Sequence, residues 1–267
     1  GIKGHRPTKH FFGAPFLDGR HASIFLGRGI YTREKMIALD VNRTTHELTE
    51  RWRWHCYDSN SPWFGQGYHN YAIADVDWDG RDEIVYGSMV IDDNGKGLST
   101  TGLGHGDAQH CGDFDPYRHG QEQFACLEHH PCMNYRNATT GEIYYRWVGS
   151  GDDGRALCGN FSNAFPGATG ATIGSSGMVS CVADKVNTEI GFGISLNSRI
   201  YWDGDLLDEL LDSPGTEKDA AVTKPGGGRI FMSANCNMNN WSKNNACATG
   251  DIFGDWREEI VLRTNGS

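Results

Sequence analysis

Long apolar runs are absent from this chain of 267 residues, and proline is scarce, with 8 residues. No stretch approaches the length of a membrane-spanning helix, so a membrane span within the sequence is excluded. Glycine is abundant, with 36 residues, and this composition favours many tight turns over long helices or proline-rich linkers. A hydrophobic share of 38% indicates a globular chain, and because no linker interrupts it, residues 1–267 are interpreted as one domain.

Positive charge is in deficit. The formal net charge is −10 with histidine neutral, which disfavours a nucleic-acid partner. Much of the negative charge lies in Asp-rich loops, where bound cations would neutralise it. An acidic polymer could still bind where metals or local Lys and Arg side chains reverse the field.

The eight cysteines include no C-x-x-C pair, which makes zinc-ribbon and thioredoxin interpretations weak. Two interpretations stay open. The cysteines are reduced and buried, or the chain occupies an oxidising compartment with local disulfides, of which Cys126–Cys132 and Cys236–Cys247 are feasible. The chain begins at Gly1 with no signal-type apolar segment, so we expect a processed chain or a fragment.

The stretch around Asp75 has the clearest metal-binding pattern. Asp75, Asp77 and Asp79 alternate before Gly80, and Glu83 follows, so one loop can direct several carboxylates at one cation. Oxygen ligands in this number suit Ca²⁺. An EF-hand would need a glutamate at the twelfth loop position and helices on both sides. The flanks here are strand-like, so we predict a calcium loop between two strands of one sheet.

The strand pattern repeats. Loops that begin at Asp75, Asp113 and Asn160 lie roughly forty residues apart, and Asp251 lies about two periods further on, a spacing typical of β-propeller blades. The fold class predicted is therefore an all-β propeller, of which about five to six blades are present. The second loop keeps acidic residues and is a second candidate calcium site, with ligands Asp113, Asp115 and Glu122.

Two segments depart from the strand pattern. Residues 200–212 show a short, acidic, helix-like spacing, and residues 213–228 are rich in Gly, Pro and Thr, which predicts a mobile loop.

Four residues near the first two loops are not required by the repeat. His69 precedes the first calcium loop, His105 and Asp107 precede the second, and Glu128 ends the strand that follows. In a propeller these positions converge near the central channel. A single histidine in such a loop is more often structural, but two at equivalent positions, with two carboxylates, favour a divalent cation site.

Arg155 and Lys243 share a relative position at the start of an inner strand, and this shared position makes them catalytic candidates. The structural alternative is that Arg155 pairs with a neighbouring aspartate and that Lys243 is solvated.

Together, five motifs resemble the rhamnogalacturonan lyases of polysaccharide lyase family 11. They occur in the family's order and span nearly the whole chain, at Gly27–Arg33, Ala74–Gly87, Asp92–Ala108, Trp202–Asp212 and Asp251–Glu259. The resemblance implies an eight-bladed, calcium-binding propeller that cleaves the rhamnogalacturonan I backbone of pectin by β-elimination. It also implies that the family's N-terminal and C-terminal portions lie outside this sequence. The predicted localisation is secreted or extracytoplasmic.

The resemblance also implies residue roles. The ligands of the family's active-site calcium match His69, His105, Asp107 and Glu128, and its proposed catalytic residues match Arg155 and Lys243. The substrate-binding positions next to this lysine are Asn240, Trp241 and Ser242. The family commonly has Asn-Gly-Thr-Lys there, so Trp241 would crowd the sugar or stack on it. Asp208 replaces a usual arginine, and the loop after Asn160 has lost its acidic pair.

The residue types suit β-elimination at a uronate. Neutralising the sugar carboxylate makes the adjacent C–H proton more acidic, and calcium or a guanidinium can do this. Arg155 stays protonated and is therefore a carboxylate clamp, which leaves Lys243 as the predicted base. If the histidines bind no metal, either would be a better base. The rival hypotheses are a non-catalytic FG-GAP-like calcium propeller for adhesion or carbohydrate binding, and a degenerate lyase that binds without turnover.

Overall fold

The computed structural model describes residues 9–128, 132–148, 152–173, 178–182, 186–187, 196, 198–216 and 218–264. The chain forms two compact units, which are described separately. The first unit comprises Gly1–Asp113 and Tyr117–Gly154, and the second comprises Phe114–Pro116 and Arg155–Ser267.

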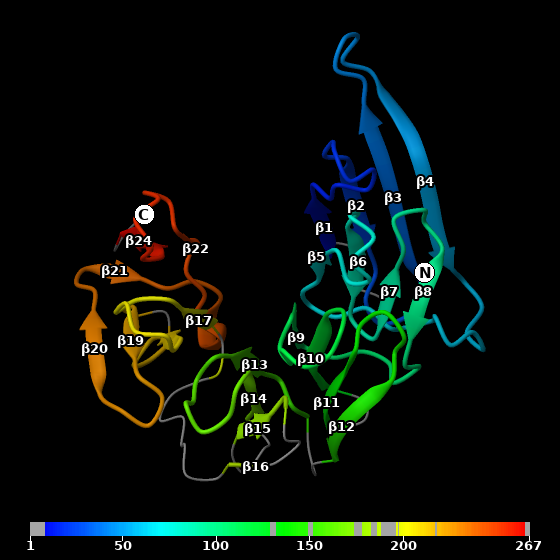
Figure 1. Ribbon diagram of the computed structural model, residues 1–267. Helices are drawn as coiled ribbons and strands as arrows, with labels where there is room; N and C mark the ends of the chain where they lie inside the picture. The colour runs from blue at the N-terminus through cyan, green and yellow to red at the C-terminus, as the bar shows by residue number, and fades with distance from the viewer. Residues whose placement is uncertain are drawn as a thin grey trace. The chain divides into compact units, whose positions relative to one another are not determined.

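The fold is all-β, as predicted (Figure 1). Every strand pair of the described residues is antiparallel, and the one helix among them is the short 3₁₀ helix η1 (Trp241–Lys243).

The residues described in the first unit form three four-stranded sheets in which consecutive strands are neighbours. The strands of the first sheet are β1 (His10–Gly13), β2 (Ile24–Arg28), β3 (Glu34–Val41) and β4 (Leu48–Cys56). The strands of the second are β5 (Ala72–Ala74), β6 (Glu83–Tyr86), β7 (Met89–Ile91) and β8 (Gly97–Thr100). The strands of the third are β9 (Ala108–Gly112), β10 (Glu122–Leu127), β11 (Cys132–Asn137) and β12 (Ile143–Val148).

In the second unit, the described residues form two more four-stranded sheets and two strand pairs. The first of these sheets contains β13 (Ala156–Gly159), β14 (Thr169–Thr172), β15 (Met178–Ser180) and β16 (Val186–Asn187). The next contains β17 (Ser198–Ile200), β18 (Glu209–Asp212), β19 (Ala221–Thr223) and β20 (Arg229–Met232). The strand pairs are β21 (Cys236–Asn237) with β24 (Arg263–Thr264), and β22 (Ala248–Gly250) with β23 (Glu259–Val261).

Neighbouring sheets of the first unit share their cores. Phe25 and Met36 of the first sheet pack in one cluster with Ile84 and Met89 of the second. Strand β6 is buried along its whole length, because both faces of the second sheet are covered. Successive antiparallel four-stranded sheets are the expected form of propeller blades. A propeller is defined by the arrangement of all the sheets around one axis, so the propeller stays a prediction.

The helix-like interpretation of residues 200–212 is wrong. Strand β17 ends at Ile200, a loop follows, and β18 begins at Glu209. Leu210 and Leu211 are both buried because β18 is covered on both faces, and such a strand has an apolar run that sequence periodicity does not separate from a helix. The segment 213–228, predicted to be a mobile loop, contains strand β19.

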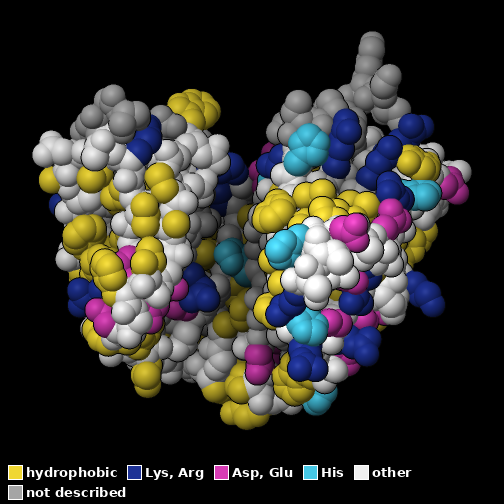
Figure 2. Space-filling view, turned by 90° about the horizontal axis from the view of Figure 1, so that it is seen from above, with side chains coloured by type: hydrophobic (Ala, Val, Ile, Leu, Met, Phe, Trp, Pro, Cys, Tyr) yellow, Lys and Arg dark blue, Asp and Glu magenta, His cyan; other side chains and the backbone are white. Residues whose placement is uncertain are grey.

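The surface is mixed in charge. On the face seen in Figure 2, Lys and Arg side chains lie among Asp and Glu side chains, so the net negative charge is not spread as one uniform acidic surface. Among the described residues, no helix has the length and apolar character needed to cross a membrane.

Candidate metal centre and active site

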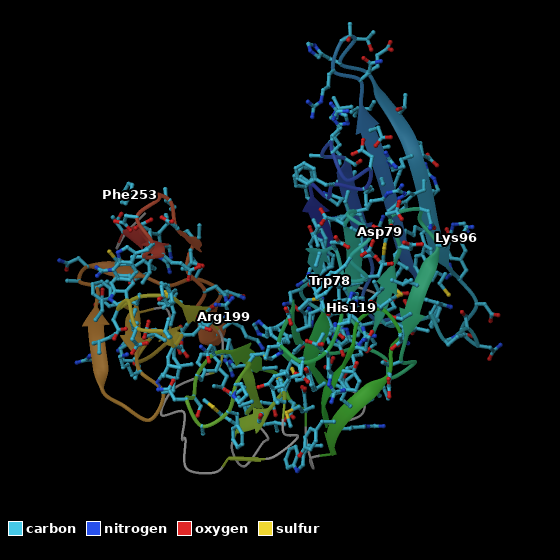
Figure 3. The ribbon with its side chains drawn as sticks, viewed as in Figure 1. Trp78, Asp79, Lys96, His119, Arg199 and Phe253 are labelled. Atoms are coloured by element: carbon cyan, nitrogen blue, oxygen red, sulfur yellow. The ribbon has the colours of Figure 1, made fainter. Side chains whose placement is uncertain are left out.

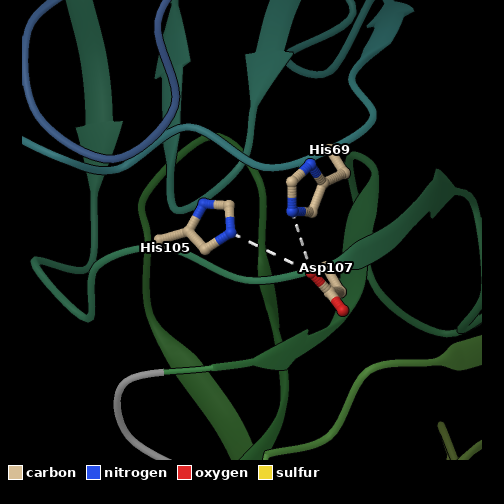
Figure 4. A group of neighbouring side chains, drawn as sticks. All are labelled: His69, His105 and Asp107. Atoms are coloured by element: carbon tan, nitrogen blue, oxygen red, sulfur yellow. Dashed lines mark ion pairs between the residues drawn. The ribbon is translucent and has the colours of Figure 1, made fainter. Parts of the chain in front are cut away.

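The four residues predicted to bind the active-site cation lie together in the first unit. The Nε2 atom of His69 lies 3.1 Å from Oδ1 of Asp107, and Nε2 of His105 lies 3.9 Å from the same oxygen (Figure 4). On its other side, His105 Nε2 lies 3.1 Å from Oε2 of Glu128. The two imidazole rings are 4.9 Å apart, centre to centre, and nearly perpendicular.

Backbone contacts set the orientation of His105. Its Nδ1 donates to the carbonyl oxygens of Gly67 (2.5 Å) and Ile30 (3.1 Å), which directs Nε2 at the carboxylates. The side chain is fully buried, and this burial lowers the pKa of His105 to about 4. A neutral imidazole with its proton on Nδ1 presents a lone pair at Nε2, the form that binds a metal.

A buried glutamate, Glu34, holds the loop that carries Gly67. The Glu34 carboxylate accepts hydrogen bonds from the backbone N–H groups of Gly65 and Gly67, each at 3.2 Å. Gly67 in turn accepts the His105 hydrogen bond, so Glu34 acts on the centre through the backbone. Burial raises the pKa of Glu34 to about 7.

Tyr31 is a residue that sequence reasoning missed. Its hydroxyl lies 3.3 Å from Nε2 of His69, and its ring lies 4.1 Å from that of His105, centre to centre. It comes from the loop between β2 and β3, and its only signal in the sequence was its membership of the Gly27–Arg33 motif.

The chemistry of this group fits a divalent cation. One ligand atom each of His69, His105 and Asp107 lie within 4.8 Å of one another. A Ca²⁺ ion sits about 2.3–2.6 Å from each of its ligands, so an ion between these atoms matches that spacing. Imidazole nitrogens are also common ligands of transition metals, so the group suits more than one divalent ion.

The predicted calcium loop connects β5 to β6 and brings together Asp75, Asp77 and Glu83. Gly80 has a φ of 89°, which confirms the sharp turn. The carboxylate of Asp79, also a predicted ligand, accepts the N–H of Arg81 at 2.9 Å, and its role in binding the ion stays a prediction. The neighbouring Trp78 lies against His119, with their ring centres 4.2 Å apart (Figure 3).

Glu83 is the buried centre of this loop. Its Oε2 accepts the N–H of Val76 at 2.8 Å, and its Oε1 has no hydrogen-bond partner among the described residues. Burial first, and then the charges of the loop aspartates, raise the pKa of Glu83 to about 8. A buried carboxylate oxygen of this kind is costly without a cation. The site therefore fits Ca²⁺ through oxygen ligands alone.

The structure adds two acidic residues that sequence reasoning did not assign to this site. Asp92 and Asp93, from the turn between β7 and β8, lie in a group with Glu83. Arg81 Nη1 lies 2.9 Å from Asp93 Oδ2. Their adjacency in the sequence was visible, but their proximity to Glu83 depends on the pairing of β6 with β7.

The second predicted calcium loop is divided between the two units. Asp113 is exposed and Glu122 is buried in the first unit, whereas Asp115 is buried in the second. Their shared role as ligands stays a prediction.

The predicted catalytic and substrate-binding residues belong to the second unit. Arg155 directly precedes β13 and is partly buried, and Lys243 ends η1 and is partly buried. Asn240 and Trp241 have positive φ angles of 65° and 49°, and Trp241 is 72% exposed. The backbone of Ser242 lies in η1 between them and Lys243. Their roles stay predictions.

The local disulfides are not formed. The Cys126 thiol donates to the carbonyl of Ala108, and the strand register pairs Cys126 with Met133 and Leu127 with Cys132, so Cys126 and Cys132 are not opposite each other. The thiol of Cys236 donates to the carbonyl of Ala234, and that of Cys247 accepts a hydrogen bond from Asn239.

Comparisons with known proteins define the class first. A crystal structure of the rhamnogalacturonan lyase YesW superposes with a TM-score of 0.85 at 35% identity, over 96% of this chain and 43% of that one. The Bacillus licheniformis rhamnogalacturonan lyase PL11 superposes with a TM-score of 0.84 at 34% identity, over 96% of this chain and 43% of that one. The chain thus shares the fold of these rhamnogalacturonan lyases over nearly its whole length.

The family follows from the sequence match. Residues 2–267 match the model of the C-terminal domain of rhamnogalacturonan lyase family 11, and the chain belongs to this family. It is 36% identical to the rhamnogalacturonan exolyase YesX and 37% identical to the rhamnogalacturonan endolyase YesW, both of Bacillus subtilis strain 168. Each alignment covers 99% of this chain but only 45% and 42% of the relatives, so the chain spans less than half of their length.

Proposed function

We propose that this chain is part of a secreted, calcium-dependent rhamnogalacturonan lyase, built as a β-propeller, that cleaves the rhamnogalacturonan I backbone by β-elimination at galacturonate. The observation that carries the proposal is the cluster of His69, His105, Asp107 and Glu128, because it brings two imidazoles and two carboxylates together in a chain of the rhamnogalacturonan lyase family. A chain that only used cations to stabilise its loops would not need two imidazoles directed at shared carboxylates.

The reaction assigns separate tasks to the chain's residues. The base removes the proton from the carbon next to the sugar carboxylate, the electron pair forms the new carbon–carbon double bond, and the glycosidic oxygen at the fourth carbon leaves and is protonated by water. Lys243 is proposed as the base, and Arg155 as the bidentate clamp for the carboxylate. When bound, calcium supplies positive charge that makes the proton easier to remove.

The cluster prepares the site in several ways. His105 is held neutral and oriented by two backbone carbonyls, and Glu34 fixes the loop that carries one of them. Tyr31 packs on His105 and reaches His69, which restricts both rings. A site fixed before substrate binds loses little free energy in reorganising. The exposed ring of Trp241 offers an apolar platform on which a sugar could stack.

The remaining parts of the proposal have indirect support. Successive antiparallel four-stranded sheets are the form of propeller blades, and oxygen-only loops of this kind suit the millimolar calcium found outside cells. A pectic substrate is also extracellular. Secretion is proposed for these two reasons.

The proposal is tested by incubating the chain with rhamnogalacturonan I and following the ultraviolet absorbance of the unsaturated uronate product, with calcium and with chelator. We expect product only with a divalent cation, and a roughly 10²-fold or larger loss of rate for His105→Ala. Asp58→Asn, at an exposed position of the first unit, is the matched control and should keep full activity.

The outcomes separate the candidate functions. Polysaccharide binding without product would support the non-catalytic propeller or the degenerate lyase. Product that forms equally well in chelator would contradict the role of calcium but keep the lyase. Full activity of Lys243→Ala would remove that residue as the base.

A further inference from the structure

Two loops, one in each unit, have the same backbone design. In the first unit Glu83 begins β6 and accepts the N–H of Val76, seven residues earlier, at 2.8 Å. In the second unit Glu209 begins β18 and accepts the N–H of Trp202, also seven residues earlier, at 2.8 Å. The loops 75–83 and 201–209 can therefore be aligned residue by residue.

The residue before each glutamate strengthens this alignment. Asp82 Oδ2 accepts the N–H of Phe16 at 2.7 Å, and Asp208 Oδ2 accepts the N–H of Asn160 at 2.8 Å. Phe16 and Asn160 lie in the corresponding loop of the preceding sheet in each unit. The two loops are thus equivalent in their hydrogen bonds as well as in their spacing.

The alignment shows what differs between them. Asp77 and Asp79 of the first loop align with Asp203 and Asp205 of the second, whereas Asp75 aligns with Tyr201. The second loop therefore has one carboxylate fewer. Its remaining carboxylates, on Asp203, Asp205 and Glu209, still lie within 4.8 Å of one another, in the kind of group that holds a metal ion.

A lysine occupies the centre of this group. The Lys224 ammonium nitrogen lies 2.6 Å from Asp203 Oδ2, 2.5 Å from Asp205 Oδ2 and 3.5 Å from Glu209 Oε1. Glu209 is 1% exposed, and its Oε1 corresponds to Oε1 of Glu83. Neither oxygen has a hydrogen-bond partner among the described residues, but Oε1 of Glu209 has the Lys224 ammonium 3.5 Å away.

The backbone holds Lys224 in place. Lys224 directly follows β19, and a tight turn joins it to β20. Within this turn, the carbonyl of Lys224 accepts the N–H of Gly227 at 2.9 Å. The loop carboxylates, Asp203 first and then Asp205, raise the pKa of Lys224 above its ordinary value, so the side chain is positively charged throughout the physiological range.

We propose that the ammonium group of Lys224 takes the place of a metal ion in the 203–209 loop, so that this loop keeps its structure without calcium while the equivalent 75–83 loop binds the ion. One fixed positive charge matches the loss of one carboxylate. Removal of the lysine would leave three carboxylates in calcium-binding geometry, and the loop would then take up Ca²⁺ from solution. This inference does not depend on lyase activity.

The test counts calcium ions bound per chain by equilibrium dialysis and elemental analysis. Lys224→Met removes the charge and keeps much of the side-chain volume, and we expect it to bind one calcium ion more than the wild-type chain. Lys224→Arg keeps the charge and should bind the wild-type number. Lys218→Met removes an exposed lysine of the same unit, so it is the matched control and should also bind the wild-type number.

A second pair of variants locates the new ion, and the first of them is independent of whether Lys224→Met folds. Asp203→Asn in the wild-type chain should leave the calcium count unchanged, and Asp203→Asn added to Lys224→Met should abolish the extra ion. Loss of one ion on Asp203→Asn in the wild-type chain would overturn the proposal, because calcium would already occupy the loop. A folded Lys224→Met variant, judged by circular dichroism, that gains no ion would also overturn it.

Discussion

The acidic residues of loops 75–83 and 201–209 have two roles, which are to shape the loop and to bind a cation. A comparison of the two loops separates these roles. In both loops, a glutamate at the start of a strand accepts a hydrogen bond from the backbone N–H of the residue seven positions earlier, and this hydrogen bond shapes the loop. The buried Oε1 atoms of Glu83 and Glu209 both lack a hydrogen-bond partner among the described residues, but in the second unit the Lys224 ammonium lies 3.5 Å from the oxygen of Glu209. The loop shape therefore belongs to the fold, and the choice of cation depends on side chains that the fold brings to it.

The loop between β22 and β23 extends this comparison. Glu259 Oε2 accepts the N–H of Ile252, again seven residues earlier, at 2.6 Å. The position of Asp77 is taken here by Phe253, which is 79% exposed. The glutamate hydrogen bond thus persists in a loop whose acidic set is incomplete.

The largest expected difference between the two loops is their response to calcium. At a free calcium concentration a thousandfold above the dissociation constant, binding should raise the free energy of opening of the β5–β6 region by about 4 kcal/mol. The β17–β18 region should show no change, because Lys224 already neutralises its loop. Hydrogen exchange of peptides from both regions, with calcium and with chelator, measures this. Equal protection of both regions by calcium would contradict the comparison.

A buried carboxylate without a basic partner should also make stability depend on pH. Because burial raises the pKa of Glu34 from 4.5 to about 7, the folded state keeps this proton over a pH range in which the unfolded state has lost it. The contribution of Glu34 to the free energy of unfolding should therefore fall by about 3 kcal/mol as the pH rises from 4.5 to 7. Urea unfolding across this range measures the slope, and Glu34→Gln should flatten it. An unchanged slope in that variant would refute the assignment.

Replacing the titratable carboxyl group of Glu83 should stabilise the calcium-free protein. Glu83→Gln keeps an acceptor for the N–H of Val76, and it removes a carboxyl group whose raised pKa, about 8, makes the protein take up a proton on folding at neutral pH. We expect a gain of about 1–2 kcal/mol in chelator at neutral pH, and loss of most of the stabilisation by calcium. Lower stability of this variant in chelator would show that Glu83 is already compensated, as Glu209 is.

The smallest expected effects concern the aspartates that connect neighbouring sheets. Asp82→Ala removes the hydrogen bond from Phe16, and Asp208→Ala removes that from Asn160, and each should cost about 1 kcal/mol. Asp208 also pairs with Arg199 at 2.9 Å. Arg199, which is labelled in Figure 3, is half exposed, so loss of this ion pair should add less than about 1 kcal/mol. Urea unfolding of both variants is the measurement. A cost several times larger at one position would break the equivalence of the loops.

Much of the candidate site could be predicted from local spacing. The alternating aspartates before Gly80 and the closing Glu83 lie within one short loop, so their proximity follows from a single turn between two strands. His69, His105 and Glu128 are distant in the sequence, but the repeat places them at related positions, and the structure brings them together.

The contacts that were missed come from turns outside the repeat pattern. Tyr31 reaches His69 from the loop between β2 and β3, and Lys224 reaches Glu209 from the far end of β19. Neither residue has a sequence neighbour that predicts its partner. The helix-like interpretation of residues 200–212 failed because burial on both faces of a strand hides the alternation that normally identifies it.

The sequence by itself determined the family, the all-β class and the acidic loops. The family depends on motifs and their order along the chain, and the strands and loops depend on residue spacing within one or two strands. Only the tertiary structure decided which side chains lie beside each buried carboxylate. Sheet pairing brings Asp92 and Asp93 to Glu83, and it brings the ammonium of Lys224 to Glu209. The energy of a buried charge depends on every group within a few ångströms of it, and those groups come from parts of the chain that only folding makes neighbours.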